Sequence, residues 1–162
     1  MVAHQQPAVR AGETGPLPQD APLARYHALF RSLPALAPGE AVGRWDALPI
    51  GPRWYRVLFT ALLWAGGLRG WIGKEFAPDG AGVNLCRRGA RLIVRCRLRL
   101  DGPVASRADG RPALRLRSLD RSPLRLVRDE LRSAADGTVL GLTYLVVPPL
   151  SRVRLPFAIR RG

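Results

Sequence analysis

The sequence predicts a mainly β (α+β) protein, an antiparallel β-barrel of about seven to nine strands with one or two N-terminal helices. From Gly70 onward, apolar residues recur at every second position in short runs, which is typical of half-buried strands. Asp-Gly pairs and prolines separate these runs. No segment with helical spacing lies between them, so parallel strands joined by crossover helices are not expected.

Both helices are expected in the first half of the chain. Residues 22–33 carry apolar side chains at helical spacing, and Pro34 ends this segment. A second helix of about 12 residues is expected after Pro52, because proline suits the first turn of a helix. The pair Gly66–Gly67 then supplies its end.

About seven or eight segments are strand candidates, and the first of them reads equally well as a turn into a strand. In chain order they are residues 40–48, 71–76, 82–86, 91–100, 113–119, 124–132, 138–147 and 151–160. The signals that separate several of them are Asp101–Gly102, Asp109–Gly110, Asp136–Gly137 and Pro148–Pro149.

An arginine row marks the third strand of the alternating region. The arginines are Arg91, Arg95, Arg97 and Arg99, and the apolar residues between them are Leu92, Val94, Cys96, Leu98 and Leu100. Successive side chains of a strand face opposite sides, so we expect the apolar set to face the core and the arginines to face solvent. A polyanion surface is the less favoured interpretation, because no aromatic residue for base stacking lies between residues 77 and 143.

The chain is strongly basic for its length. It has 162 residues and a formal net charge of +14. Lys74 is the only lysine among its 26 basic residues, and the arginines are spread from Arg10 to Arg161. This charge fits a polyanion partner, and it fits equally well a solubility effect of an arginine-rich composition.

The length suits a single domain over residues 21–162, after a flexible N-terminal tail over residues 1–20. The tail has no apolar core of the kind that signal peptides carry. The longest uncharged apolar run, Val57–Leu68, is too short to span a bilayer. Two cysteines, Cys86 and Cys96, are too few for a disulfide framework. These observations predict a soluble, cytoplasmic protein.

Lys74 is the first candidate for chemistry. A lone lysine in an arginine-rich chain is a candidate for anion contact or proton transfer, because the pKa of lysine responds to burial more readily than that of arginine. Glu75 follows it directly, so a surface ion pair is the alternative interpretation. With His4 and His27 the only histidines, no group of residues has the spacing of metal ligands.

A second candidate lies in the segment LVRDELR. Alternation places Glu130 on the same face as Arg128 and Arg132, and places Asp129 and Leu131 on the other face. If the arginines face solvent, Glu130 belongs to a surface ion network. If that face lines a cavity, the same three residues form a polar site, and the sequence leaves both interpretations open.

Three segments together resemble the GxWxG-domain family of uncharacterised proteins. They are GRWDAL (43–48), GWIGKEFAPDGAGVNL (70–85) and VRDELRSAADGTVLGLTYL (127–145), with Ala47 standing at the second glycine of the motif. The resemblance implies a lipocalin-like or calycin-like barrel and no assigned chemistry. Nitrobindin-like barrels share a Gly-x-Trp motif and bind haem through a late histidine. This chain has no histidine after His27, so haem is not expected.

The first functional hypothesis is a barrel that binds a hydrophobic or amphipathic small molecule, acyl or isoprenoid-like. Its expected ligand-binding residues are Trp45, Trp71, Lys74, Phe76 and Tyr144. The alternative is an isomerase or cyclase on the same barrel, with acid–base candidates Lys74, Glu75, Glu130 and Tyr144. A third hypothesis is association with nucleic acid, another polyanion or an anionic membrane through surface arginines. No cofactor is expected in any of the three.

Overall fold

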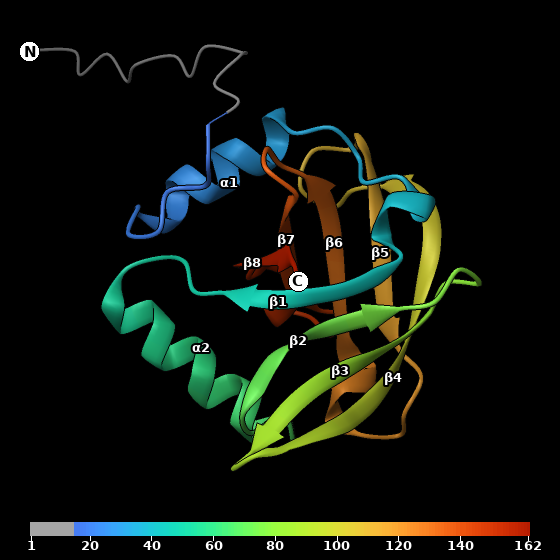
Figure 1. The fold of residues 1–162 in the computed structure, drawn as a ribbon. Helices are drawn as coiled ribbons and strands as arrows, with labels where there is room; N and C mark the ends of the chain where they lie inside the picture. Colours follow the sequence, from blue (N-terminus) through green and yellow to red (C-terminus); the bar gives the residue numbers. More distant parts are fainter. Residues whose placement is uncertain (1–14) are drawn as a thin grey trace, which may run out of the picture.

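The computed structural model describes residues 15–162 and confirms the antiparallel barrel. Over this range, eight strands pair in chain order, and the last closes the barrel against the first (Figure 1). The strands are β1 (Gly43–Leu48), β2 (Trp71–Phe76), β3 (Ala81–Arg88), β4 (Arg91–Ala105), β5 (Pro112–Ser118), β6 (Val127–Ser133), β7 (Thr138–Leu145) and β8 (Leu155–Arg161). Closure leaves the sheet without a free edge for a further strand.

Both α-helices form where the sequence predicts them. The helical elements are α1 (Leu23–Ser32), α2 (Arg53–Ala65) and the short 3₁₀ helices η1 (Pro38–Ala41), η2 (Pro123–Leu126) and η3 (Leu150–Arg152). Tyr26 and Phe30 of α1 are buried in a cluster with Leu140 and Ala158, so α1 covers the outer wall at β7 and β8. No helix within residues 15–162 is long and apolar enough to cross a membrane.

Packed side chains fill one end of the barrel. The cluster contains Leu36, Ala41, Trp45, Phe76, Leu98, Leu100, Leu114, Leu116, Leu131, Val139, Phe157 and Ile159. The indole N–H of Trp45 donates to the carbonyl of Ala41, 2.7 Å away. Because Ala41 belongs to η1, this hydrogen bond fixes η1 as the cover of the filled end.

β4 is longer than the sequence predicts. It runs on through Asp101 and Gly102, so the prediction of a turn at these residues is wrong. A register shift between Asp101 and Pro103 opposite β5 marks a bulge, which lets the strand continue past a pair of residues typical of turns. The chain turns later, where the N–H of Gly110 donates to the carbonyl of Ser106 at 2.8 Å.

The apolar set of β4 does not all face the core. Leu98 and Leu100 are buried as predicted, but Leu92 and Val94 are 52% and 59% exposed, so that part of the prediction is wrong. The reason is a second bulge, where the register against β3 shifts and Cys96 adopts a φ of 49°. The extra residue reverses the alternation in the first half of the strand. The four arginines of the row are exposed.

The segment that precedes α1 contacts the barrel domain. The hydroxyl of Tyr26 donates to the carbonyl of Pro18 at 2.5 Å, and the N–H of Gly51 donates to the carbonyl of Gln19 at 2.7 Å. These contacts attach residues 17–20 to the domain. Residues 1–14, which make up most of the expected tail, lie outside the described residues.

Candidate functional site

A cavity of about 550 Å³ occupies the end of the barrel opposite the packed cluster. Its walls come from the inner faces of β2 to β8, and α2 and η2 border its mouth. Most of the wall is apolar, with Phe59, Leu62, Leu63, Leu124, Leu145 and Leu155 among the lining residues. A Cβ atom on Gly66, at the end of α2, would lie 3.0 Å from the side chain of Leu124, so α2 and η2 meet at the mouth.

The floor of the cavity is polar. The Nζ atom of Lys74 lies 3.2 Å from Oδ2 of Asp129 and donates to Oδ1 of Asn84 at 3.1 Å. The indole N–H of Trp71 donates to the same Asn84 oxygen, also at 3.1 Å. The hydroxyl of Thr143 donates to Oδ1 of Asp129 at 2.7 Å. Side chains from four strands therefore form one connected layer.

Strand register explains why these residues meet. Lys74 of β2 is paired with Asn84 of β3, and Asp129 of β6 is paired with Thr143 of β7. Directly opposed residues of neighbouring strands point to the same face of the sheet. β2 and β6 stand four strands apart in the closed barrel of eight, so the Lys74–Asp129 ion pair joins opposite walls.

The ion pair is almost entirely removed from solvent. The side chains of Lys74 and Asp129 are 7% and 10% exposed. The rings of Trp71 and Phe157 each lie 5.6 Å from Nζ of Lys74, which places the ammonium against aromatic faces. Among the described residues, two of the three ammonium N–H groups have oxygen partners. The third N–H group has no oxygen partner among these residues.

A neutral thiol adds to the floor. Sγ of Cys96 lies 2.9 Å from Oγ of Ser118, and both residues line the cavity. Burial raises the pKa of the Cys96 thiol, so the sulfur is protonated at neutral pH. Cys86 and Cys96 are both free thiols.

The expected ligand-binding residues fall into two layers. Trp71 and Lys74 line the cavity, and Tyr144 borders it. Trp45 and Phe76 point into the barrel as well, but they belong to the packed cluster at the filled end. The acid–base candidates Lys74, Glu75, Glu130 and Tyr144 do not form one site. Glu75 is exposed, whereas Lys74 next to it is buried.

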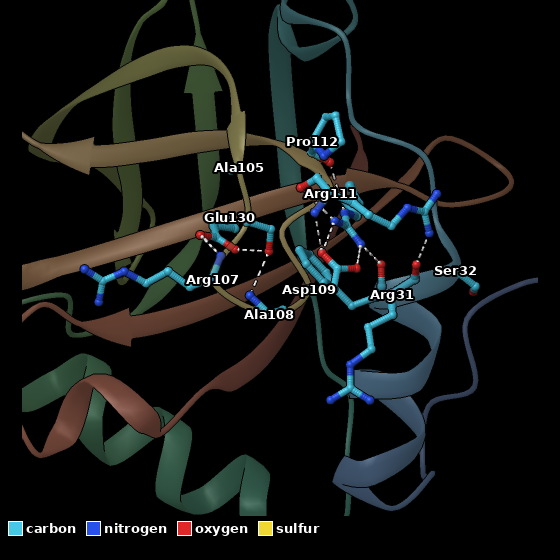
Figure 2. Close-up of polar contacts among 12 residues, drawn as sticks. Arg31, Ser32, Ala105, Arg107, Ala108, Asp109, Arg111, Pro112 and Glu130 are labelled. Atoms are coloured by element: carbon cyan, nitrogen blue, oxygen red, sulfur yellow. Dashed lines mark hydrogen bonds and ion pairs between the residues drawn. The ribbon is translucent and has the colours of Figure 1, made fainter.

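The side chain of Glu130 lies on the outer side of the barrel wall. It is 1% exposed, and its carboxylate accepts hydrogen bonds from the hydroxyl of Ser106 at 2.5 Å and the hydroxyl of Tyr144 at 3.1 Å. The carboxylate also accepts one from the N–H of Arg107 at 3.0 Å (Figure 2). Neither interpretation offered by the sequence is correct, because the loop between β4 and β5 covers the carboxylate. Glu130 anchors this loop and does not reach the cavity.

Arg132 anchors the same loop from its other side. Its guanidinium is fully buried and forms a two-pronged pair with Asp109, with N–O distances of 2.7 and 2.8 Å. It also donates to the carbonyls of Phe30, Pro112 and Arg111, so all five N–H groups have partners. Figure 2 shows three of the residues around this network, with Asp109 and Arg111 of the loop beside Arg31 at the end of α1.

Asp129 and Asn84 are functional candidates that the sequence interpretation passed over. Alternation had already placed Asp129 on the face opposite the arginines, and that face is the interior. A carboxylate on the apolar face of a strand needs a buried partner, and this was the available signal. Asn84 stands on the interior face of β3 and carries the same signal more weakly, because an amide has no charge.

No protein-family model matches the chain, and no curated protein matches its sequence. Among solved structures, it is similar to the crystal structure of a protein from Thermomonospora curvata. The match covers 89% of this chain and 90% of that chain, with a TM-score of 0.66 and 20% sequence identity. A likeness at this identity supports the barrel fold alone. Within residues 15–162, no three His, Cys, Asp or Glu side chains gather as metal ligands would.

Proposed function

We propose that the protein binds a hydrophobic or amphipathic small molecule, of acyl or isoprenoid type, inside the barrel. The observation that carries the proposal is the cavity of about 550 Å³ with apolar walls and a polar floor. Binding sites for small molecules are concave, mostly apolar and supplied with a few polar groups that fix the orientation of the ligand. This cavity has the size and the composition of such a site.

The floor favours a ligand whose polar end is an uncharged oxygen. The charges of Lys74 and Asp129 cancel, so a carboxylate placed there would be an additional unpaired charge in a buried site. A hydroxyl or carbonyl oxygen can instead accept a hydrogen bond from the third N–H of the Lys74 ammonium without adding a charge. The apolar part of the ligand then extends along the leucine-rich wall toward α2.

Native mass spectrometry of freshly purified protein, before and after organic extraction, tests the proposal. We expect a bound mass that extraction removes, and re-addition of the extract should quench tryptophan emission in a saturable way, since Trp71 lies in the cavity. Substituting Leu155→Phe narrows the cavity, and we expect at least about tenfold weaker binding. The matched control is Leu119→Phe, because Leu119 is 44% exposed and lies outside the cavity.

An isomerase or cyclase on the same barrel is the second candidate. Lys74 and Asp129 favour it, because an ammonium and a carboxylate 3.2 Å apart beside an apolar cavity can exchange a proton with a bound molecule. In this hypothesis Lys74 and Asp129 are the acid–base groups, in place of the sequence candidates Glu75, Glu130 and Tyr144. Prolonged incubation of the extracted ligand with the protein, followed by mass and chromatographic analysis, decides the question. If the ligand is recovered unchanged from both the native protein and Lys74→Met, the isomerase or cyclase hypothesis is wrong.

A further inference from the structure

The outer face of α2 is apolar and exposed. At 3.6 residues per turn, one face of the helix presents the residues that we call the α2 face: Trp54, Val57, Leu58, Ala61, Leu62 and Trp64. Trp54, Val57 and Trp64 are each at least 60% exposed. Among the residues of α2, only Tyr55 is buried. Helices at the surface of globular domains normally turn polar residues outward, and a continuous exposed apolar patch marks an interaction site.

The stretch of sequence around the α2 face carries only positive charge. No aspartate or glutamate stands between Asp46 and Glu75, and this stretch contains Arg53, Arg56 and Arg69. Asp20, from the segment before α1, pairs with Arg56 of the helix at 2.7 Å and leaves Arg53 and Arg69 to flank the face. The guanidinium of Arg69 lies 5.3 Å from the ring of Trp64, so it borders the apolar residues directly. Arg53 is exposed at the beginning of the helix. Positive charge therefore flanks both ends of the face.

The α2 face lies beside the mouth of the cavity. Leu58 and Leu62 belong to the α2 face and also line the cavity. Phe59 and Leu63, on the side of the helix that faces the barrel, line the cavity as well. A second hollow of about 540 Å³ lies between α2 and strands β1 and β8, and Val57, Ala61 and Trp64 of the α2 face lie along its rim. Cavities on both sides leave α2 with few packing contacts, and Figure 1 shows the helix standing away from the barrel wall.

We propose that α2 docks on the surface of an anionic lipid bilayer, with the α2 face in the interfacial region and the flanking arginines on lipid phosphates. Tryptophan is favoured at the membrane interface, and an amphipathic helix with basic flanks binds anionic lipid through buried apolar area and electrostatic attraction together. Docking in this orientation turns the mouth of the cavity toward the lipid. The inference goes beyond ligand binding and does not depend on it.

Charge argues against a second copy of the chain as the occupant. A two-fold pairing through α2 would bring Arg53 and Arg69 of both copies together, with no acidic residue in the same stretch to pair with them. The net charge of +14 adds general repulsion between copies. An anionic surface supplies negative charges that can pair with the same arginines.

Sedimentation of the full chain with lipid vesicles tests the inference. We expect binding to phosphatidylcholine vesicles containing about 30% phosphatidylglycerol, weak binding to pure phosphatidylcholine, and loss of binding as salt rises. The double variant Trp54→Ser/Trp64→Ser should bind the anionic vesicles at least about tenfold more weakly. In the native protein, lipids brominated near the headgroup should quench tryptophan emission, because Trp54 and Trp64 are exposed and Trp45 is buried.

The β3–β4 hairpin supplies a matched control. Leu92→Ser/Val94→Ser removes two residues that are 52% and 59% exposed on a different segment of the chain, and it should weaken vesicle binding clearly less than the tryptophan variant does. Equal losses of binding in the two double variants would overturn the inference. Binding as strong as that of the native protein in Trp54→Ser/Trp64→Ser would also overturn it, because the surface arginines alone would then account for the attraction. A dimer that this variant converts to a monomer without any change in lipid binding would assign α2 to a second copy.

Discussion

Lys74 and Asp129 form an ion pair across the interior of the barrel, with 3.2 Å between Nζ and Oδ2, although they come from strands on opposite walls. Breaking a buried pair leaves one charge without a partner, which typically costs about 3–5 kcal/mol. We therefore expect Lys74→Met and Asp129→Leu each to lower the free energy of unfolding by about this amount. The double variant should lose clearly less than the sum of the two single losses.

Chemical denaturation of the four proteins in this cycle measures the coupling. The exposed pair Arg44–Asp46 is the control, since its side chains are 44% and 51% exposed. Arg44→Met should lower stability by less than about 1 kcal/mol. Additive losses at Lys74 and Asp129 would mean that the two charges do not depend on each other, and the electrostatic account of the floor would then be wrong.

The pair between Asp109 and Arg132 predicts a pH dependence of stability. Hydrogen bonds from Arg132 hold the pKa of the Asp109 carboxyl below its usual range. The folded state therefore releases this proton at a lower pH than the unfolded state. The contribution to stability is complete above the ordinary pKa of about 3.9 and is lost as pH falls through the lowered value.

The substitution Asp109→Asn should accordingly destabilise the protein at pH 7, and the difference from the native protein should shrink as pH falls below about 4. Urea unfolding at several pH values measures it. Asp136→Asn is the control, because Asp136 is exposed and asparagine tolerates its φ of 57°. A difference between the Asp109 variant and the native protein that stays constant down to pH 2 contradicts the assignment.

The barrel was predictable because period-two patterning and turn residues are local properties of the chain. Leu98, Leu116 and Leu131 alternate with polar residues and are buried as the pattern requires. The bulge at Cys96 was not predictable, because the extra residue is defined only by the register against β3. That single residue reverses the side-chain direction of Leu92.

The site was predictable in part. Lys74 stands out in the sequence as the only lysine, but its partner Asp129 lies 55 positions further along the chain, on a strand that meets β2 only when the barrel closes. Glu130 was a plausible candidate because no local pattern shows that the loop of Ser106 covers it. Local alternation gives the face of a strand, whereas the depth of a side chain along the barrel depends on the long-range register.

The neutral floor predicts a preference among head groups. For apolar chains of equal length, we expect an alcohol or an aldehyde to bind at least about tenfold more tightly than the carboxylate. The reason is that Lys74 is already paired with Asp129. Competition titrations followed by tryptophan emission measure the order. In Asp129→Asn, the unpaired ammonium should reverse it, and a native protein that prefers carboxylates would contradict the proposed role of the floor.

The alkylation rate of Cys96 should depend on whether the cavity holds a ligand. Burial raises the pKa of its thiol, so little thiolate is present at neutral pH, and alkylation by iodoacetamide should be much slower than in the unfolded chain. The rate in the folded protein should rise only above the ordinary thiol pKa of about 8.5. Because Cys96 lines the cavity, a bound ligand should slow the reaction further.

Peptide mass spectrometry of timed alkylation, with and without the extracted ligand, measures the protection. Cys86 provides an internal control, since it is 2% exposed and is not among the residues that line the cavity. Its slow alkylation should not depend on the ligand, because only opening of the barrel wall exposes it. Protection of Cys86 and Cys96 to the same extent would show that the ligand stabilises the whole barrel, whereas protection of Cys96 alone places the ligand against the floor.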